Sequence, residues 1–261
     1  GCIPSKSLLD SSHRYADAIN HFSDHGIEVT KPKLNVSKMM ERKDKIVSQL
    51  TMGISGLFKA NKVTQIHGHA KIIGPNHVEV ASSDSSEVHE TKNIVIASGS
   101  SPINISVAKI DNKNIVDSTG ALEFESVPKK LGIIGAGIIG LELGSVWSRL
   151  GSEVTVLEAM DKFLPMADKR IANDVLKEFN KQGLNINLEC KVTSAISDDK
   201  AVTVKYENKG NLSEIKVDKL IVAVGRKPNT DNLLDQNCGL SVDDNGFIPV
   251  NDVCETNVQN I

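Results

Sequence analysis

A cysteine stands second in the chain, within the sequence GCIPSK (residues 1–6). Pro4 suits the first turn of a helix, and apolar residues follow it at helical spacing as far as about Phe22. Cys2 would then lie at the N-terminal end of that helix, where unpaired backbone N–H groups favour the nucleophilic thiolate form of a cysteine. This position suggests a redox thiol, but without its flanking residues Cys2 could as well be a buried, inert cysteine.

A second candidate for chemistry is GAGIIG (135–140), which has the spacing G-x-G-x-x-G of dinucleotide-binding turns. It follows the apolar run LGIIG (131–135), which reads as a buried strand, and it opens a helix expected over 138–150. The glycines serve a tight turn, a close approach of backbone to pyrophosphate, and close packing of helix on strand. The alternative is a βα turn whose glycines serve packing alone. The expected nucleotide contacts are Gly135, Ala136, Gly137, Ile138, Ile139, Gly140, Leu141 and Glu142.

The next strand, EVTVLE (153–158), ends in an acid, about twenty residues after the glycines. A carboxylate at this point can accept hydrogen bonds from a ribose 2′-hydroxyl and would repel a 2′-phosphate. No arginine stands among the following residues, 159–161. Glu158 therefore predicts NAD rather than NADP.

Composition excludes several classes of function. The 261 residues are 39% hydrophobic and 24% charged with a net charge of −3, which is unlike a nucleic-acid-binding protein, and 3% aromatic residues give no stacking platform. No apolar run is long enough to span a membrane. The spacing of the cysteines matches neither a zinc site nor a disulfide scaffold, so we expect no metal and a reduced, cytosolic setting. The cysteines are Cys2, Cys190, Cys238 and Cys254.

The remaining pattern predicts the elements that would position these residues. A long helix is expected over 36–60, a further helix over 168–182, and a small sheet from the runs VTQI, AKII, HVEV and NIVIA between 63 and 97. A linker is expected over 101–130. Alternating stretches at 190–196, 201–206 and 212–217 predict a β-meander, and KLIVAVG (219–225) predicts a buried strand.

Five motifs in order resemble those of the flavin-dependent disulfide reductases, and within this family those of the dihydrolipoamide dehydrogenases. They are GCIPSK, IASGS (96–100), GAGIIGLELG (135–144), VTVLE (154–158) and AVGRKPN (223–229), and the resemblance covers essentially the whole chain. It implies an α/β fold of FAD- and NAD(P)-binding Rossmann-like domains with three-layer ββα architecture, in which the NAD domain is inserted in a partial FAD domain. The implied parts are 1–113 (partial FAD-binding), 114–230 (NAD-binding) and 231–261 (return to the FAD domain), without a dimerisation domain.

The resemblance also implies roles for single residues. Cys2 matches the second cysteine of a C-x4-C redox pair, the one that lies against the flavin; the first would precede Gly1, so we expect the chain to be part of a larger enzyme, truncated at both ends. Lys6 matches a lysine near the flavin, and its expected partner in a buried ion pair is Glu142. The expected FAD contacts are Lys6, Ala70, Ser98 (where the family usually has Thr), Gly99 and Ser100, and the further backbone contacts to NAD are Val192 and Gly225.

The function implied is FAD-dependent oxidation of protein-bound dihydrolipoamide to lipoamide, with NAD as electron acceptor. Implied partners are the lipoyl domains of 2-oxoacid dehydrogenase complexes or of the glycine cleavage system, with a homodimer as the intact form, in the cytoplasm or in the mitochondrial matrix of a eukaryote. The alternatives are another flavin disulfide reductase, such as mercuric reductase, or an inactive NAD-binding fragment. We expect the 261 residues alone to lack activity.

Overall fold

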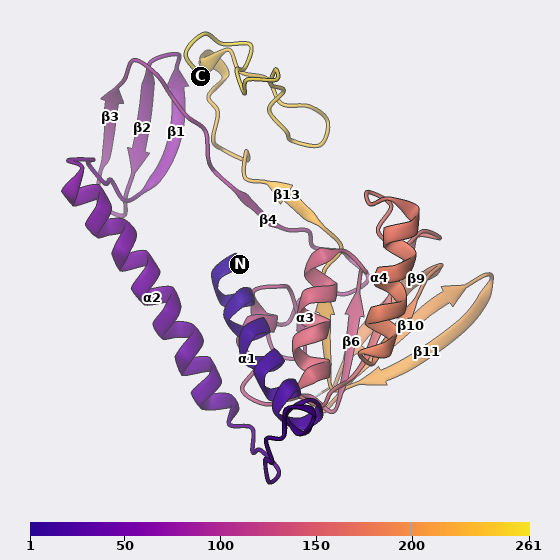
Figure 1. Cartoon of the computed structure of the whole chain (residues 1–261). Helices are drawn as coiled ribbons and strands as arrows, with labels where there is room; N and C mark the ends of the chain where they lie inside the picture. The colour runs from indigo at the N-terminus through magenta and orange to yellow at the C-terminus, as the bar shows by residue number, and fades with distance from the viewer. Residues whose placement is uncertain (199) are drawn as a thin grey trace. The chain divides into compact units, whose positions relative to one another are not determined.

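The computed structural model describes residues 1–198 and 200–261, which fall into two units by their internal contacts. The first unit comprises residues 1–52 and 102–225, and the second comprises residues 53–101 and 226–261. Each has its own arrangement of helices and strands (Figure 1).

A five-stranded parallel sheet forms the centre of the first unit (Figure 1). Every neighbouring pair of strands is parallel, so all five carboxyl ends lie at one edge of the sheet, where α/β proteins bind ligands. In their order across the sheet the strands are β5 (Ile115–Val116), β12 (Lys219–Val222), β6 (Lys130–Ile134), β7 (Glu153–Leu157) and β8 (Leu184–Asn187).

The two faces of this sheet are covered differently, because side chains alternate along each strand. In β12, Ile221 belongs to a core shared with the helices and the fully buried Trp147, whereas Leu220 and Val222 belong to a core shared with an antiparallel meander. The result is three layers: helices, parallel sheet and antiparallel sheet. The helices are α1 (Cys2–Asn20), α3 (Ile138–Arg149), α4 (Lys169–Lys181) and the first part of α2 (Val36–Ala60), with short 3₁₀ turns η1 (Phe22–His25) and η2 (Gly120–Leu122). The meander consists of β9 (Cys190–Ser197), β10 (Val202–Asn208) and β11 (Asn211–Val217).

The second unit is smaller and has a modest core. Its antiparallel sheet packs beside a segment near the C-terminus: the Ile72 N–H donates to the Leu233 carbonyl at 2.8 Å, and Lys71 contacts Asp235 at 2.8 Å. The buried centre consists of Ile72, Cys238 and Ile261. The elements are β1 (His69–Gly74), β2 (His77–Ala81), β3 (Ser86–Glu90), the pair β4 (Ser100–Pro102) and β13 (Arg226–Pro228), and η3 (Gln236–Cys238).

Most expected elements are confirmed, including the helix over 36–60 despite its two internal glycines, the meander, and the three-layer α/β architecture. The helix expected over 168–182 is α4, with the Asp168 carboxylate accepting from the Arg170 N–H at 2.9 Å as its N-cap.

Two expected strands are wrong. VTQI (63–66) and NIVIA (93–97) form no strand, because neither has a neighbouring strand with which to form a ladder within residues 1–198 and 200–261. The Ile94 N–H instead donates to the Asn260 carbonyl at 2.8 Å, and Ile94 and Ile96 pack on the small core. The third strand of the small sheet is β3, whose polar residues SEVHE lack an apolar signal. Inside the expected linker lie β5 and η2.

The assignment of chain segments to an FAD part and an NAD part stays a prediction.

None of the described helices combines the length and apolar character that crossing a membrane requires.

Candidate nucleotide and thiol site

The glycine turn lies at the carboxyl edge of the parallel sheet, directly after its central strand β6. Gly135 has φ +102°, its N–H donates to the Leu157 carbonyl at 2.9 Å, and a Cβ at this position would lie 2.5 Å from the Ala223 carbonyl oxygen. A Cβ on Gly140 would in turn collide with the Gly135 carbonyl oxygen. These two glycines are therefore required by the turn itself.

Gly137 differs, because the structure leaves space beside it. It is the N-cap of α3, it is exposed, and no described atom beyond its own and its neighbouring residues lies within 4 Å of the place where a Cβ would be. The helix has no side-chain cap; its first backbone bond runs from the Leu141 N–H to the Gly137 carbonyl at 3.0 Å. An uncapped helix N-terminus beside open space suits a pyrophosphate, so these residues fit the dinucleotide that the sequence predicts.

The carboxylate of Glu158 faces this turn from the end of β7. Its Oε2 accepts from the Ala136 N–H at 2.8 Å, and its Oε1 accepts from the Met160 N–H at 2.9 Å. The backbone of Glu158 is bonded to Asn187 and Cys190, at 2.9 and 2.8 Å. A half-buried carboxylate is thus fixed beside the glycine turn, with lone pairs left for hydroxyl donors and a charge unfavourable to a phosphate.

The two other residues predicted to contact NAD, Val192 and Gly225, belong to the same unit as the glycine turn. Val192 is the third residue of β9, opposite Tyr206 in the meander, and it is only 9% exposed. Gly225 follows β12, has φ +124°, and its carbonyl accepts from the Ile103 N–H at 3.0 Å. Their backbone contacts to NAD stay predictions.

Cys2 is the first residue of α1 and is exposed. Its turn is stabilised by Ser5, whose N–H and hydroxyl both donate to the Gly1 carbonyl, at 3.1 and 2.7 Å. The four cysteines all lie in the described part of the chain and are free; Cys254 is exposed, and Cys190 and Cys238 are buried.

Lys6, one turn after Cys2, reaches across to α3. Its Nζ contacts Glu142 Oε1, so the pairing predicted from the sequence is confirmed, whereas its place beside a flavin stays a prediction. The expectation that the pair is buried is wrong: the side chains of Lys6 and Glu142 are 63% and 29% exposed. The reason is that Lys6 precedes the buried part of α1, which begins with Ser7 and Leu8.

The residues predicted to contact FAD are divided between the units. Lys6 belongs to the first, and Ala70 and residues 98–100 belong to the second. In the second unit, Ile72 of β1 bonds through its N–H and C=O to residues 233 and 235, on the side of the strand away from β2. Ala70 lies two residues earlier in the same strand, so its N–H and C=O point to that same side. The backbone groups of Ala70 therefore point to the outer edge of β1, where they could contact an adenosine, and this fits the expected main-chain contact.

The oxygen atoms of residues 98–100 are used within the chain. Asn229 donates to the Ser98 carbonyl from its side chain and to the Gly99 carbonyl from its backbone, both at 3.0 Å. Arg226 Nε donates to the Ser100 hydroxyl at 2.7 Å. Sequence reasoning assigned no role to Arg226 and Asn229, although both lie in the quoted motif AVGRKPN.

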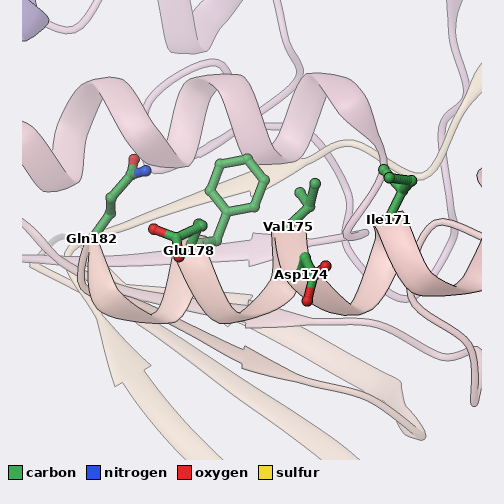
Figure 2. A pocket seen from close by; sticks show the side chains of 6 residues that line it. Ile171, Asp174, Val175, Glu178 and Gln182 are labelled. Carbon is green, nitrogen blue, oxygen red and sulfur yellow. The ribbon is translucent and has the colours of Figure 1, made fainter.

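A groove of about 380 Å³ runs along α4, away from these residues (Figure 2). Its lining includes none of the predicted site residues. It consists of Ile171, Asp174, Val175, Glu178, Phe179 and Gln182.

Comparison with known proteins gives consistent results. A family model described as pyridine nucleotide-disulphide oxidoreductase matches residues 1–261. The chain is 48% identical over 259 residues to a dihydrolipoyl dehydrogenase from Cupriavidus necator, and 47% identical over 266 residues to the mitochondrial dihydrolipoyl dehydrogenase of Dictyostelium discoideum. These alignments cover 99% and 100% of the chain but 55% and 54% of the relatives, so the chain spans about half their length.

Solved structures are similar over the whole chain as well. The HOCl-induced flavoprotein disulfide reductase RclA from Escherichia coli, in its Cu(II) complex, superposes with a TM-score of 0.81 at 27% identity, covering 100% of this chain and 54% of that one. LpdA from Mycobacterium tuberculosis, with a TM-score of 0.89 at 20% identity and coverage of 99% and 56%, shows the same fold.

Proposed function

The chain belongs to the pyridine nucleotide-disulphide oxidoreductase family, and we propose that it is the part of a dihydrolipoamide-oxidising flavoenzyme that holds NAD and one redox sulfur. The observation that carries this proposal is the contact between Lys6 and Glu142. It joins the helix that begins at Cys2 to the helix that begins at the glycine turn. The candidate thiol and the candidate nucleotide site therefore belong to one unit.

In this proposal, four parts of the chain bind NAD. The uncapped N-terminus of α3 binds the pyrophosphate of NAD, Gly137 leaves room for it, and Glu158 accepts hydrogen bonds from the adenosine ribose. Val192 and Gly225 supply backbone contacts to the same nucleotide. Glu158 disfavours NADP, because its charge would lie next to the 2′-phosphate.

Cys2 would be the flavin-facing sulfur of a protein disulfide that the substrate reduces by thiol–disulfide exchange. A dihydrolipoyl dithiol is oxidised to its disulfide, and the protein disulfide that contains Cys2 is reduced to two thiols, a balanced two-electron exchange. The second sulfur of that protein disulfide would come from a part of the longer enzyme outside this chain. FAD, when bound, would carry the two electrons from the thiols to NAD. Lys6, Ala70, Ser98, Gly99 and Ser100 would contribute to holding it.

The surroundings of the enzyme are proposed from the family. Its partners would be lipoyl domains of 2-oxoacid dehydrogenase complexes or of the glycine cleavage system, and the complete enzyme would be a homodimer. It would work in the cytoplasm, or in the mitochondrial matrix of a eukaryote; the Dictyostelium discoideum relative is named mitochondrial.

The test uses nucleotide binding to the 261-residue chain, measured by calorimetry with NADH and NADPH. We expect NADH to bind more tightly, and Glu158→Ala to reduce this preference at least about tenfold, the effect of losing roughly 1.4 kcal/mol of discrimination. The matched control is Glu153→Ala, which removes an exposed carboxylate from the start of the same strand. An unchanged NADH/NADPH ratio in Glu158→Ala would refute the assignment.

Activity is tested at the length of the relatives. We expect a longer protein containing this sequence to oxidise dihydrolipoamide with NAD, and Cys2→Ser to abolish the reaction while NADH still binds. The 261 residues alone should bind NADH without oxidising dihydrolipoamide. Activity in the absence of the Cys2 thiol would contradict the proposed chemistry.

A further inference from the structure

We propose that Arg42 is a positioning residue, which fixes the second turn of α1 and thereby the placement of Cys2 and Lys6. The chemistry assigned to Cys2 rests on the proposed function. The contacts of Arg42 are independent of the proposed function.

The guanidinium of Arg42, in α2, makes four contacts, and every acceptor belongs to α1. Nη1 lies 3.3 Å from the Ser7 carbonyl oxygen, 3.1 Å from the Ser7 hydroxyl and 3.1 Å from the Ser11 hydroxyl. Nη2 donates to Asp10 Oδ2 at 2.8 Å. Because a guanidinium is a rigid planar fork, these acceptors define both the height of α1 along α2 and its rotation about its own axis.

The helix that carries Arg42 is itself anchored at this point. The next residue, Lys43, has a side chain that is 1% exposed, and its ammonium donates to the Leu122 carbonyl at 3.1 Å and to Glu123 Oε1 at 2.6 Å. The backbone of α2 is therefore anchored next to Arg42, whose exposed guanidinium reaches α1. Two adjacent side chains of α2 connect it to η2 on one side and to α1 on the other.

The remaining polar contacts of the opening turns are weaker determinants of position. The helix has no side-chain N-cap, and the Lys6–Glu142 pair is a single contact with side chains 63% and 29% exposed. The Arg42–Asp10 pair is exposed to a similar degree, at 47% and 39%, so Arg42 differs by its three further contacts with Ser7 and Ser11. Leu8 is fully buried and packs α1 into the layer of helices, and the contacts of Arg42 add to this packing. Arg42 thus supplies the directional contacts that begin one residue after Lys6.

Arg14 offers a matched control, because it contacts the same carboxylate, Asp10, as Arg42 does. Arg14 Nε donates to Asp10 Oδ1 at 3.1 Å, but both residues lie on α1. Arg14→Gln therefore removes a positive charge from Asp10 without removing a contact between helices. Arg42→Gln removes both, and Arg42→Lys keeps the charge without the planar fork.

The first measurement is the rate at which iodoacetamide alkylates Cys2 at pH 7, relative to the exposed Cys254 of the second unit, with both sites resolved by peptide mass mapping. Cys2 is already exposed, so loosening α1 cannot greatly increase its access. A changed rate would therefore report a changed placement of the thiol in the first turn of α1, and we expect Arg42→Gln to change the rate at least about twofold. Arg42→Lys should restore part of the rate, and Arg14→Gln should leave it unchanged.

The second measurement is amide hydrogen exchange of residues 3–8 together with the dissociation constant for NADH. Exchange should be faster in Arg42→Gln and not in Arg14→Gln. NADH affinity should change less than exchange in every variant, because Arg42 contacts neither the glycine turn nor Glu158. Ser11→Ala, which removes one of the four contacts, should give a smaller effect of the same sign and covers the case in which Arg42→Gln does not fold. In the longer enzyme, Arg42→Gln should lower kcat and leave KM for NAD unchanged.

Three results would overturn the proposal. The first is that Arg42→Gln shows the alkylation rate and the hydrogen exchange of the wild type, and the second is that Arg14→Gln and Arg42→Gln change them equally. The third is that Arg42→Gln loses NADH binding while Ser11→Ala behaves like the wild type. A longer wild-type protein that does not oxidise dihydrolipoamide would instead refute the proposed function. In that case the alkylation and exchange measurements would still decide the role of Arg42.

Discussion

The buried ammonium of Lys43 permits a quantitative prediction about stability. Replacing Lys43 by Met keeps most of the aliphatic stem, which fills space between α2 and η2, and removes only the charged donor. Three acceptors lose a partner: the Leu122 carbonyl at 3.1 Å, Glu123 Oε1 at 2.6 Å and Asp44 Oδ1 at 3.1 Å.

The magnitude follows from the exposure of these acceptors. The side chains of Glu123 and Asp44 are 62% and 67% exposed, so water can replace the ammonium, and the roughly 3–5 kcal/mol for a stranded buried charge does not apply. The Leu122 carbonyl lies in a residue that is only 6% exposed, and an unsatisfied buried acceptor costs about 1–3 kcal/mol. We therefore expect Lys43→Met to lower the free energy of unfolding by about 1–3 kcal/mol. Lys43→Ala should lose about 2 kcal/mol more, from the methylenes removed.

The assay is urea unfolding followed by the fluorescence of Trp147, the single tryptophan, which is fully buried in the same core as Leu122. It reports on the unit to which Lys43 belongs. For Lys43→Met the midpoint should fall by roughly 1 M, given ordinary slopes of unfolding. The control is Lys45→Met, an exposed lysine of the same helix. A Lys43→Met midpoint equal to that of the wild type, or an equal loss in Lys45→Met, would show that the reasoning about the buried acceptor is wrong.

Three further predictions concern the candidate site and the pH dependence of stability. Gly137→Ala should leave stability within about 0.5 kcal/mol, because no described atom beyond the neighbouring residues lies within 4 Å of the new Cβ, but weaken NADH binding about tenfold or more; unchanged binding in calorimetry would contradict the pyrophosphate site. Glu142→Gln should cost less than about 1 kcal/mol in urea unfolding, because its partner Lys6 is 63% exposed; a loss of about 3 kcal/mol would show a buried pair. Burial alone would raise the pKa of Asp111, but backbone N–H donors from residues 113–115 outweigh it and lower this pKa. The stabilisation by Asp111 should therefore be present above the ordinary aspartate pKa and disappear as pH falls through the lowered value, so that urea midpoints of wild type and Asp111→Asn differ at pH 7 and converge in acid.

The sequence alone determined the local parts of this protein. The glycine turn, the helix it opens and the acid at the end of the next strand occupy a short stretch of chain, and each is specified by residue type and spacing. Gly135 could be identified in advance because a positive φ is intolerable to most residues, and the helix over 36–60 because its apolar spacing persists through Gly53 and Gly56.

Tertiary structure decided the features that depend on partners distant in the sequence. NIVIA has the composition of a strand but forms none, because a strand needs a neighbour for its ladder, and the apolar residues of this run contact a small core instead. The pairing of Lys6 with Glu142 was recognisable from motifs, but its exposure was not, since exposure depends on what surrounds both helices.

Arg42 and Lys43 show the same limit most clearly. In the sequence they are two adjacent cations on an amphipathic helix, with nothing to distinguish them from a solvated face. The rotation of α2 against its neighbours buries Lys43 on the Leu122 carbonyl and directs Arg42 to four acceptors of α1. Successive residues of a helix point about 100° apart, so only the packing of the helix decides which cation enters the core and which one contacts the helix that begins at Cys2.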